Sequence, residues 1–332
     1  MFASIPCKKI SAVRVILCVF LLVCFLSAGG RAVAAYPEKS VNMIVAYAAG
    51  GSTDTLARIT AKFLEEELKS PFVVVNRTGA GGDIGFTALA KAVPDGYTIG
   101  LINMSSIVIN PITRPEIVQY RITDFTAIAN VVTDPGIMCV RADSPFKTLK
   151  DVIDYAKSNP GKLAVSHEGA GAGDHLGVVE FCKQAGIEMN LIQFDGDAPA
   201  KAAVLGGHID IIAVNVSEVA EMVKEGQLHA LAVQGDKRSG ELPDVSTFAE
   251  QGFPTVMQGV ASRGFAAPRD ISKENLDILV KAMTKIVSNE DYLAELKRLN
   301  MPVDFIAGEE YGKYLLDQNE QWEKLWKSDP WM

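Results

Sequence analysis

Short apolar runs alternate with amphipathic helical patterns along most of the chain. Residues 41–47, 72–75 and 97–102 are rich in β-branched side chains, and segments 55–68 and 84–91 place apolar residues at helical spacing. Strands and helices that alternate in this way are typical of a mostly parallel sheet covered by helices. We therefore expect an α/β fold.

A second series of the same kind follows a turn-forming stretch, Thr133-Asp134-Pro135-Gly136. It predicts strands over 136–140, 163–165, 190–193 and 211–214, and helices over 148–158, 175–186 and 198–205. The chain is expected to cross back near residues 259–264, and then to be helical over 273–288, 291–299 and 309–326. We expect two α/β domains, 35–135 with 262–332 and 136–261, with two crossing strands as the hinge.

Two glycine-rich turns connect the first strands to their helices. They read Tyr47-Ala48-Ala49-Gly50-Gly51-Ser52-Thr53-Asp54 and Asn76-Arg77-Thr78-Gly79-Ala80-Gly81-Gly82-Asp83. Glycine lets the backbone approach a ligand closely, and the first turn of a helix offers unpaired N–H donors and the positive end of the helix dipole. Both turns therefore suit an anion. No nucleophile or metal-ligand cluster accompanies them in the sequence, which favours binding over catalysis.

The first 34 residues have the pattern of a secretory signal peptide. Lys8, Lys9 and Arg14 precede the apolar run 15–26, and Ala32-Val33-Ala34 provides a small-x-small cleavage site. Because the run is shorter than the ~20 residues that span a bilayer, export with cleavage near Ala34 is favoured over an uncleaved membrane anchor.

Loss of this segment would remove four basic residues and no acidic ones, and would change the formal charge from −8 to −12. So acidic a chain, without a lysine or arginine cluster, is not expected to bind nucleic acid or an anionic membrane. Only Cys139 and Cys182 of the five cysteines would remain. One disulfide is conceivable in an oxidising compartment, but a strand position and a helix position favour two buried free thiols.

The glycine-rich turns are the first of several motifs that occur in a recognisable order. The others are Pro94-Asp95-Gly96-Tyr97-Thr98, Gly169-x-Gly171, His175-Leu176, Gly196-x-Ala198-Pro199-Ala200, Gly206-Gly207-His208-Ile209-Asp210 and Arg263-Gly264-x-Ala266-Ala267-Pro268. Together they resemble the extracytoplasmic solute receptors of the tripartite tricarboxylate transporters, also called Bug receptors. The resemblance covers essentially the whole chain after the signal.

The resemblance implies a two-lobed periplasmic binding protein, a type II-like Venus flytrap, that closes over a small organic acid and delivers it to membrane permease subunits. It implies that loops 48–54 and 79–82 hold one ligand carboxylate through backbone amides and waters, and that loops 166–173 and 194–199 of the second lobe contribute further contacts. No catalytic residue, metal or cofactor is expected, and the receptor is expected to be a monomer. The residues expected to bind the ligand are Tyr47, Ala49, Gly50, Gly51, Ser52, Thr53, Asp54, Gly79, Gly81, Gly82, Ser105, Ser166, Glu168, Gly169, Gly171 and Asp197.

Acidic residues depart from the family pattern near the second-lobe loops. Glu168 stands after His167, Asp174 precedes His175, and Asp197 precedes Ala198-Pro199, where relatives usually carry small or hydroxylated residues. An acidic side chain would repel a second ligand carboxylate unless it is protonated or paired. One hypothesis is that the far end of the ligand is neutral, hydroxylated, nitrogen-bearing or cationic. The other is that Glu168 and Asp197 point to solvent or cap helices.

Other functions fit the residues less well. An NAD-binding turn would need glycine or alanine where Ile84 stands, if Gly79 and Gly81 open the G-x-G-x-x-G fingerprint. A secreted metal-dependent hydrolase would use His167, Glu168, Asp174 and His175, whose spacing resembles no zinc motif, and no G-x-S-x-G elbow of a serine hydrolase occurs. A ligand-sensing receptor without a permease stays open, and the sequence does not name the ligand.

Overall fold

The computed structural model describes residues 36–169, 172–235, 237–254, 260–328 and 330. The predicted signal peptide, residues 1–34, lies outside the described residues. The chain divides after Glu38, and the helices and strands of the fold belong to the unit Lys39–Met332. In the ranges that the structure describes, no helix has the length and apolar character that a membrane crossing requires.

Ten strands form one sheet in the described part of the chain. Their order is β2-β1-β3-β9-β4-β7-β5-β6, and β8 and β10 also pair with β4. The strands are β1 (Val41–Val45), β2 (Phe72–Asn76), β3 (Thr98–Asn103), β4 (Phe125–Arg141), β5 (Ala164–His167), β6 (Asn190–Gln193), β7 (Ile211–Asn215), β8 (Leu228–Val233), β9 (Val260–Pro268) and β10 (Val303–Ala307).

The strands that lead into the glycine-rich turns are parallel. Strand β1 pairs in parallel with both β2 and β3, and four of its five residues are buried. Parallel strands need crossover connections and are usually covered on both faces, which explains the almost continuous apolar run. The turns that follow β1 and β2 therefore leave the same edge of the sheet.

Strand β4 is shared by two groups of strands. Its residues Phe125–Pro135 pair antiparallel with β9, whereas Gly136–Arg141 pair antiparallel with β7 and β8. We call the part built on β1–β3, β9 and β10 the first lobe, and the part built on β5–β8 the second lobe. The turn predicted at Thr133-Asp134-Pro135-Gly136 is wrong, because these residues continue the strand. Proline is tolerated at irregular strand positions, and Pro135 stands where β4 changes partners.

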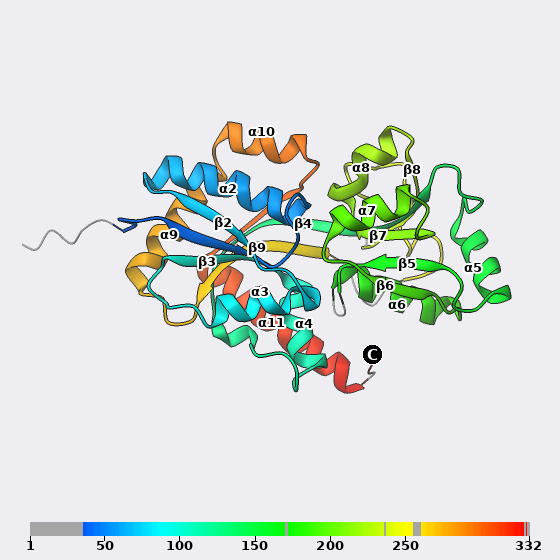
Figure 1. The fold of residues 1–332 in the computed structure, drawn as a ribbon, viewed down its shortest axis with the longest axis horizontal. Helices are drawn as coiled ribbons and strands as arrows, with labels where there is room; N and C mark the ends of the chain where they lie inside the picture. The colour runs from blue at the N-terminus through cyan, green and yellow to red at the C-terminus, as the bar shows by residue number, and fades with distance from the viewer. Residues whose placement is uncertain (1–35, 170–171, 236, 255–259, 329, 331–332) are drawn as a thin grey trace, which may run out of the picture. The chain divides into compact units, whose positions relative to one another are not determined.

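Ten α-helices within the described ranges cover the sheet, as Figure 1 shows. In the first lobe α2 packs on α9 and α10, and α4 packs on α3 and α11. In the second lobe α5 and α6 share one buried apolar cluster with the sheet, and α7 and α8 share another. The helices are α2 (Ser52–Leu68), α3 (Asp83–Ala90), α4 (Met104–Thr113), α5 (Leu149–Ser158), α6 (Gly173–Ala185), α7 (Asp197–Leu205), α8 (Val216–Lys224), α9 (Lys273–Ile286), α10 (Glu290–Arg298) and α11 (Gly308–Ser328).

These elements confirm the predicted α/β alternation and the two groups of strands. The domain limits at residues 135 and 262 stay predictions. Cys139 and Cys182 are free thiols, as expected. Cys139 is buried in β4, and burial raises the pKa of its thiol. Cys182 on α6 is only partly buried, and burial raises its pKa to about 11.

Candidate functional site

The first glycine-rich turn ends at the first turn of α2. The side chain of Asp54 orders this turn, because its Oδ2 accepts a hydrogen bond from the Gly50 N–H at 2.9 Å. Arg58 and Asn76 donate to the same carboxylate. Burial by itself would raise the pKa of Asp54, but these hydrogen bonds hold the pKa below its ordinary value. Asp54 therefore orders the first glycine-rich turn from within the first turn of α2.

The second glycine-rich turn uses backbone conformations that favour glycine. Gly79, Gly81 and Gly82 have φ angles of 123°, 68° and 96°. Asp83, the first residue of α3, accepts hydrogen bonds from Asn110 Nδ2 at 2.8 Å and Tyr120 OH at 3.1 Å. The Arg114 guanidinium lies 3.0 Å from the other oxygen of Asp83. This buried network fixes the start of α3 and the turn before it.

Both turns contact the second lobe. The Ser52 N–H donates to Asp197 Oδ1 at 3.0 Å, and the Ala48 N–H donates to the Asp195 carbonyl at 3.0 Å. A Cβ added at Gly51 would lie 2.4 Å from Asp197 Oδ1, and one added at Gly169 would lie 2.5 Å from Gly81 Cα. The segments that the sequence singles out in the two lobes therefore meet, and glycine allows them to meet at backbone distance.

Three acidic side chains gather at this boundary. Oxygen atoms of Glu168, Asp197 and Glu218 lie within 4.8 Å of one another, and all three residues are buried. We call them the acidic cluster. The Ser52 hydroxyl donates to Glu218 Oε1 at 2.6 Å, which attaches the cluster to the start of α2. Asp197 also forms an ion pair with Lys201 at 2.6 Å.

A buried arginine lies behind the acidic cluster. Arg263 on β9 is fully buried and contacts Asp134 on β4, with NH1 to Oδ2 at 3.2 Å. Its NH2 group donates to Glu218 Oε1. Burial raises the pKa of Asp134 to about 6, although the Arg263 charge acts in the opposite direction. This ion triad connects the two crossing strands to α8.

Burial dominates the electrostatics of the acidic side chains. It raises the pKa of Glu168 well above its ordinary value, and the nearby charges of Glu218, Asp174 and Asp197 raise it further. Burial also raises the pKa of Asp174 to about 7, despite the hydrogen bond that the carboxylate accepts from the Glu168 N–H at 2.7 Å. Glu168 and Asp197 are 8% and 2% exposed. The hypothesis that they point to solvent is therefore wrong. Asp197 is the first residue of α7, but the N-cap is Gly196 and no side-chain cap hydrogen bond is present at this helix start.

Several residues of the expected ligand-binding set have hydrogen-bond partners within the protein. The Tyr47 hydroxyl donates to Ser106 at 3.1 Å within the first lobe, and the Ser166 hydroxyl oxygen accepts the Ala213 N–H of the neighbouring strand at 3.0 Å. Ser105 is buried in the first turn of α4. Gly171 lies outside the described residues. Ligand contact by Ala49, Thr53 and the other residues of the expected set stays a prediction.

The residues expected for a metal-dependent hydrolase do not form one ligand cluster in the described ranges. The rings of His167 and His175 lie against each other with their centroids 4.7 Å apart and their planes tilted by 49°. Burial lowers the pKa of His175 to about 3, and the carboxylate of Asp174 accepts the Glu168 N–H at the start of α6. Among the described residues, the group with metal-ligand spacing is the acidic cluster, which contains no histidine.

The sequence analysis did not identify Glu218, Asp134 or the role of Arg263 as their ion-pair partner, since only folding brings these residues together.

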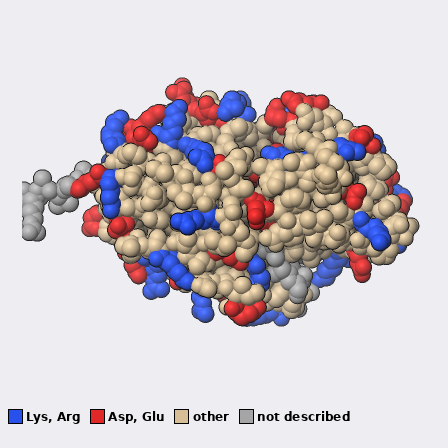
Figure 2. Space-filling view, in the orientation of Figure 1, with Lys and Arg blue, Asp and Glu red and all other residues tan. Residues whose placement is uncertain are grey.

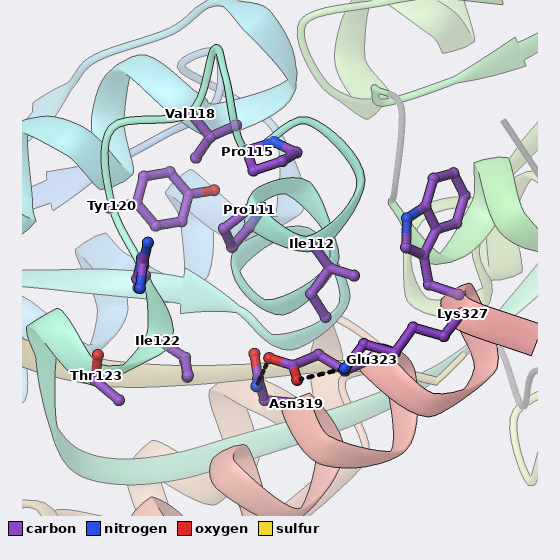
Figure 3. A pocket seen from close by; sticks show the side chains of 12 residues that line it. Pro111, Ile112, Pro115, Val118, Tyr120, Ile122, Thr123, Asn319, Glu323 and Lys327 are labelled. Carbon is purple, nitrogen blue, oxygen red and sulfur yellow. Dashed lines mark hydrogen bonds and ion pairs between the residues drawn. The ribbon is translucent and has the colours of Figure 1, made fainter. Parts of the chain in front are cut away.

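A cavity of about 400 Å³ lies elsewhere in the first lobe. Figure 3 shows it between α4, the segment after α4 and α11, with Glu323 between Asn319 and Lys327 along α11. None of the expected ligand-binding residues lines it.

Figure 2 shows Lys and Arg interspersed with Asp and Glu on the visible face, without a continuous basic patch among the described residues.

Known proteins share both the sequence pattern and the fold of this chain. Residues 56–329 match the family model described as the tripartite tricarboxylate transporter family receptor. The chain is 29% identical to Protein BugT of Bordetella pertussis over 290 residues, which covers 86% of this chain and 88% of BugT. It is similar to the periplasmic binding protein BugD, with 31% identity, a TM-score of 0.81 and coverage of 88% and 98%. MatC from Rhodopseudomonas palustris with bound malate is 26% identical, with a TM-score of 0.82 and coverage of 87% and 99%.

Proposed function

The chain belongs to the tripartite tricarboxylate transporter receptor family, and we propose that it captures a small organic carboxylate between its two lobes and delivers it to the permease subunits of a tripartite transporter. The site of action is the periplasm, after removal of residues 1–34 near Ala34. The malate found in MatC, a relative with the same fold, supports this ligand class.

The hydrogen bond from the Ser52 N–H to Asp197 is the observation that carries this proposal. It is a contact between a helix N-terminus and a carboxylate, the same contact that a ligand carboxylate needs. Peptide N–H groups and the helix dipole stabilise such an anion without a compensating cation. The first turn of α2 is therefore directed at a carboxylate, and a ligand carboxylate can bind beside that of Asp197 at the remaining unpaired N–H groups of this helix end.

Capture requires that one ligand molecule contacts both lobes, because only a differential interaction with the closed state can favour closure. Contacts between the lobes occur at both glycine-rich turns, at Gly51 with Asp197 and at Gly81 with Gly169. Strands β4 and β9 lie beside each other near these contacts and would bend during closure. The site needs no activated nucleophile, so we expect binding without chemistry.

The test is a thermal-shift and calorimetric screen of the exported protein. Organic acids, aromatic acids and amino acids are each compared with the matching amide, which lacks the negative charge. At least one acid, added in excess, should raise the melting temperature, since a ligand that binds only the folded state stabilises it by mass action. The matching amide should not raise it. The proposal fails if no acid binds, or if a bound acid lies away from the two glycine-rich turns in a crystal structure.

A further inference from the structure

Glu168 is a buried carboxylate without a partner. It is 8% exposed, and its carboxylate makes no hydrogen bond or ion pair within the ranges that the structure describes. Its oxygens point into the acidic cluster, where they lie within 4.8 Å of oxygens of Asp197 and Glu218. An uncompensated charge in such a place is unfavourable unless a proton or a cation neutralises it.

We propose that the ligand carries, beside its carboxylate, one cationic nitrogen that binds between Glu168, Asp197 and Glu218. This inference rests on the proposed function, because it names the ligand class of the same site. The receptor is thereby assigned to amino-carboxylates or other zwitterions instead of plain dicarboxylates.

The geometry suits a nitrogen. An ammonium group has three donors, and its hydrogen bonds to carboxylates are about 2.8 Å long, so one nitrogen reaches three acceptors that lie up to about twice that distance apart. The oxygens of the acidic cluster are within this limit. The Ser52 N–H and hydroxyl contact two of the three carboxylates from the first lobe. A ligand nitrogen here would therefore lie at the boundary that closes.

The charges favour a single positive charge. Asp197 is already paired with Lys201, and Glu218 is paired with Arg263. Of the three carboxylates in the acidic cluster, that of Glu168 forms no ion pair within the described ranges, and only the more distant charge of Arg263 acts on it. A divalent metal ion would bring a second positive charge close to Lys201 and Arg263, whereas one ammonium matches the one unpaired carboxylate. A second ligand carboxylate would instead face Asp197 and Glu218, and repulsion of this kind excludes the wrong ligand.

The test compares three series that are matched in length, by calorimetry on the exported protein. The zwitterions are β-alanine, γ-aminobutyrate and δ-aminovalerate. Their dicarboxylate matches are succinate, glutarate and adipate, and their neutral-ended matches are propionate, butyrate and valerate. We expect at least one zwitterion to bind about tenfold or more tightly than both of its matches, a difference of about 1.4 kcal/mol.

Two variants assign the preference to Glu168. Glu168→Gln should reduce the zwitterion preference to less than about threefold while carboxylate binding persists, and Glu188→Gln, an exposed matched control, should keep it. Circular dichroism and the melting temperature check that both variants fold. Tight dicarboxylate binding that is unchanged in Glu168→Gln would overturn the inference and leave the proposed function standing. Binding of calcium chloride alone that requires Glu168 would overturn it in favour of a metal site. Failure of all three series would overturn the inference, whereas the proposed function fails only if no acid of the wider screen binds.

Discussion

The carboxylate of Asp197 lies against the backbone of Gly51, so closely that a Cβ on the glycine would be 2.4 Å from Asp197 Oδ1. The same oxygen accepts the next peptide N–H, that of Ser52. Asp197 is also the first residue of α7 and pairs with Lys201 one turn later. One carboxylate thus faces the N-termini of two helices, one from each lobe, and the absence of a side chain at Gly51 makes this contact possible.

A methyl group at Gly51 should therefore impair ligand capture. Gly51→Ala is expected to weaken carboxylate binding about tenfold or more, because the lobes can no longer approach at this point. Its melting temperature without ligand should stay close to that of the wild type. Gly240→Ala is the matched control, since a Cβ there meets nothing within 4 Å. Equal affinities in the two variants, measured by calorimetry, would contradict the site.

Removal of the buried arginine should destabilise the fold strongly. Arg263→Met leaves Asp134 and Glu218 as buried charges without their partner, and loss of one member of a buried pair typically lowers the free energy of unfolding by about 3–5 kcal/mol. Arg298→Met, which breaks an exposed pair with Glu295, should lower it by less than about 1 kcal/mol. Urea unfolding measures both. Similar losses in the two variants would show that the triad contributes little.

The stabilisation that Asp174 contributes without ligand should fall as the pH rises from 3.8 to about 7. The folded-state pKa of Asp174 is raised to about 7 and that of Glu168 is raised well above its ordinary value. The folded protein therefore holds protons that the unfolded chain releases, and this stabilisation is complete below the ordinary acid pKa and lost as the pH rises through the raised pKa.

The two buried histidines, His167 and His175, have lowered pKa values and act in the opposite direction, but only below their ordinary pKa of 6.5. The difference in stability between the wild type and Asp174→Asn therefore separates the acid from the histidines. Measured by thermal unfolding, the advantage of the wild type should shrink as the pH rises from 3.8 to about 7. An advantage that grows across this range would contradict the assignment.

Thiol titration should find two free cysteines in the exported protein. In the native state Cys182 should react first and slowly, because its thiol is partly buried and its pKa is raised to about 11. Cys139 should react only after unfolding, since it is fully buried. Titration in urea without a reductant provides the count. A protein with no reactive thiol in urea would instead contain a disulfide.

Local patterns predicted most of the fold. Strand β6 has the predicted limits, and helices α2, α5 and α9 begin or end within a few residues of theirs, because β-branched runs and amphipathic spacing are properties of neighbouring residues. The turn predicted at Thr133–Gly136 does not form, because pairing with the adjacent strand outweighs the local turn propensity. Asp134 also forms an ion pair with Arg263 from that strand. Strand β10 and helices α4 and α8 carried no recognised signal.

The candidate site was predictable in part. The sequence identified the two glycine-rich turns, Glu168 and Asp197, because the spacing of glycines and acidic residues that depart from the family pattern can be read from the sequence itself. It could not identify Glu218 or Asp134 as their partners, because Glu218 follows the glycine-rich turns and Glu168 far along the chain, and Asp134 meets Arg263 only in the sheet. The fold decides which of these charged side chains are paired. The ligand class is inferred from the unpaired carboxylate of Glu168, and it could therefore not be predicted from the sequence.

Strand β4 supplies partners to β9 and β10 on one side of the changeover at Pro135 and to β7 and β8 on the other. A gene fragment that encoded either lobe alone would leave strands without their central neighbour, and open strand edges of this kind promote aggregation. The lobes are consequently not interchangeable modules for recombination.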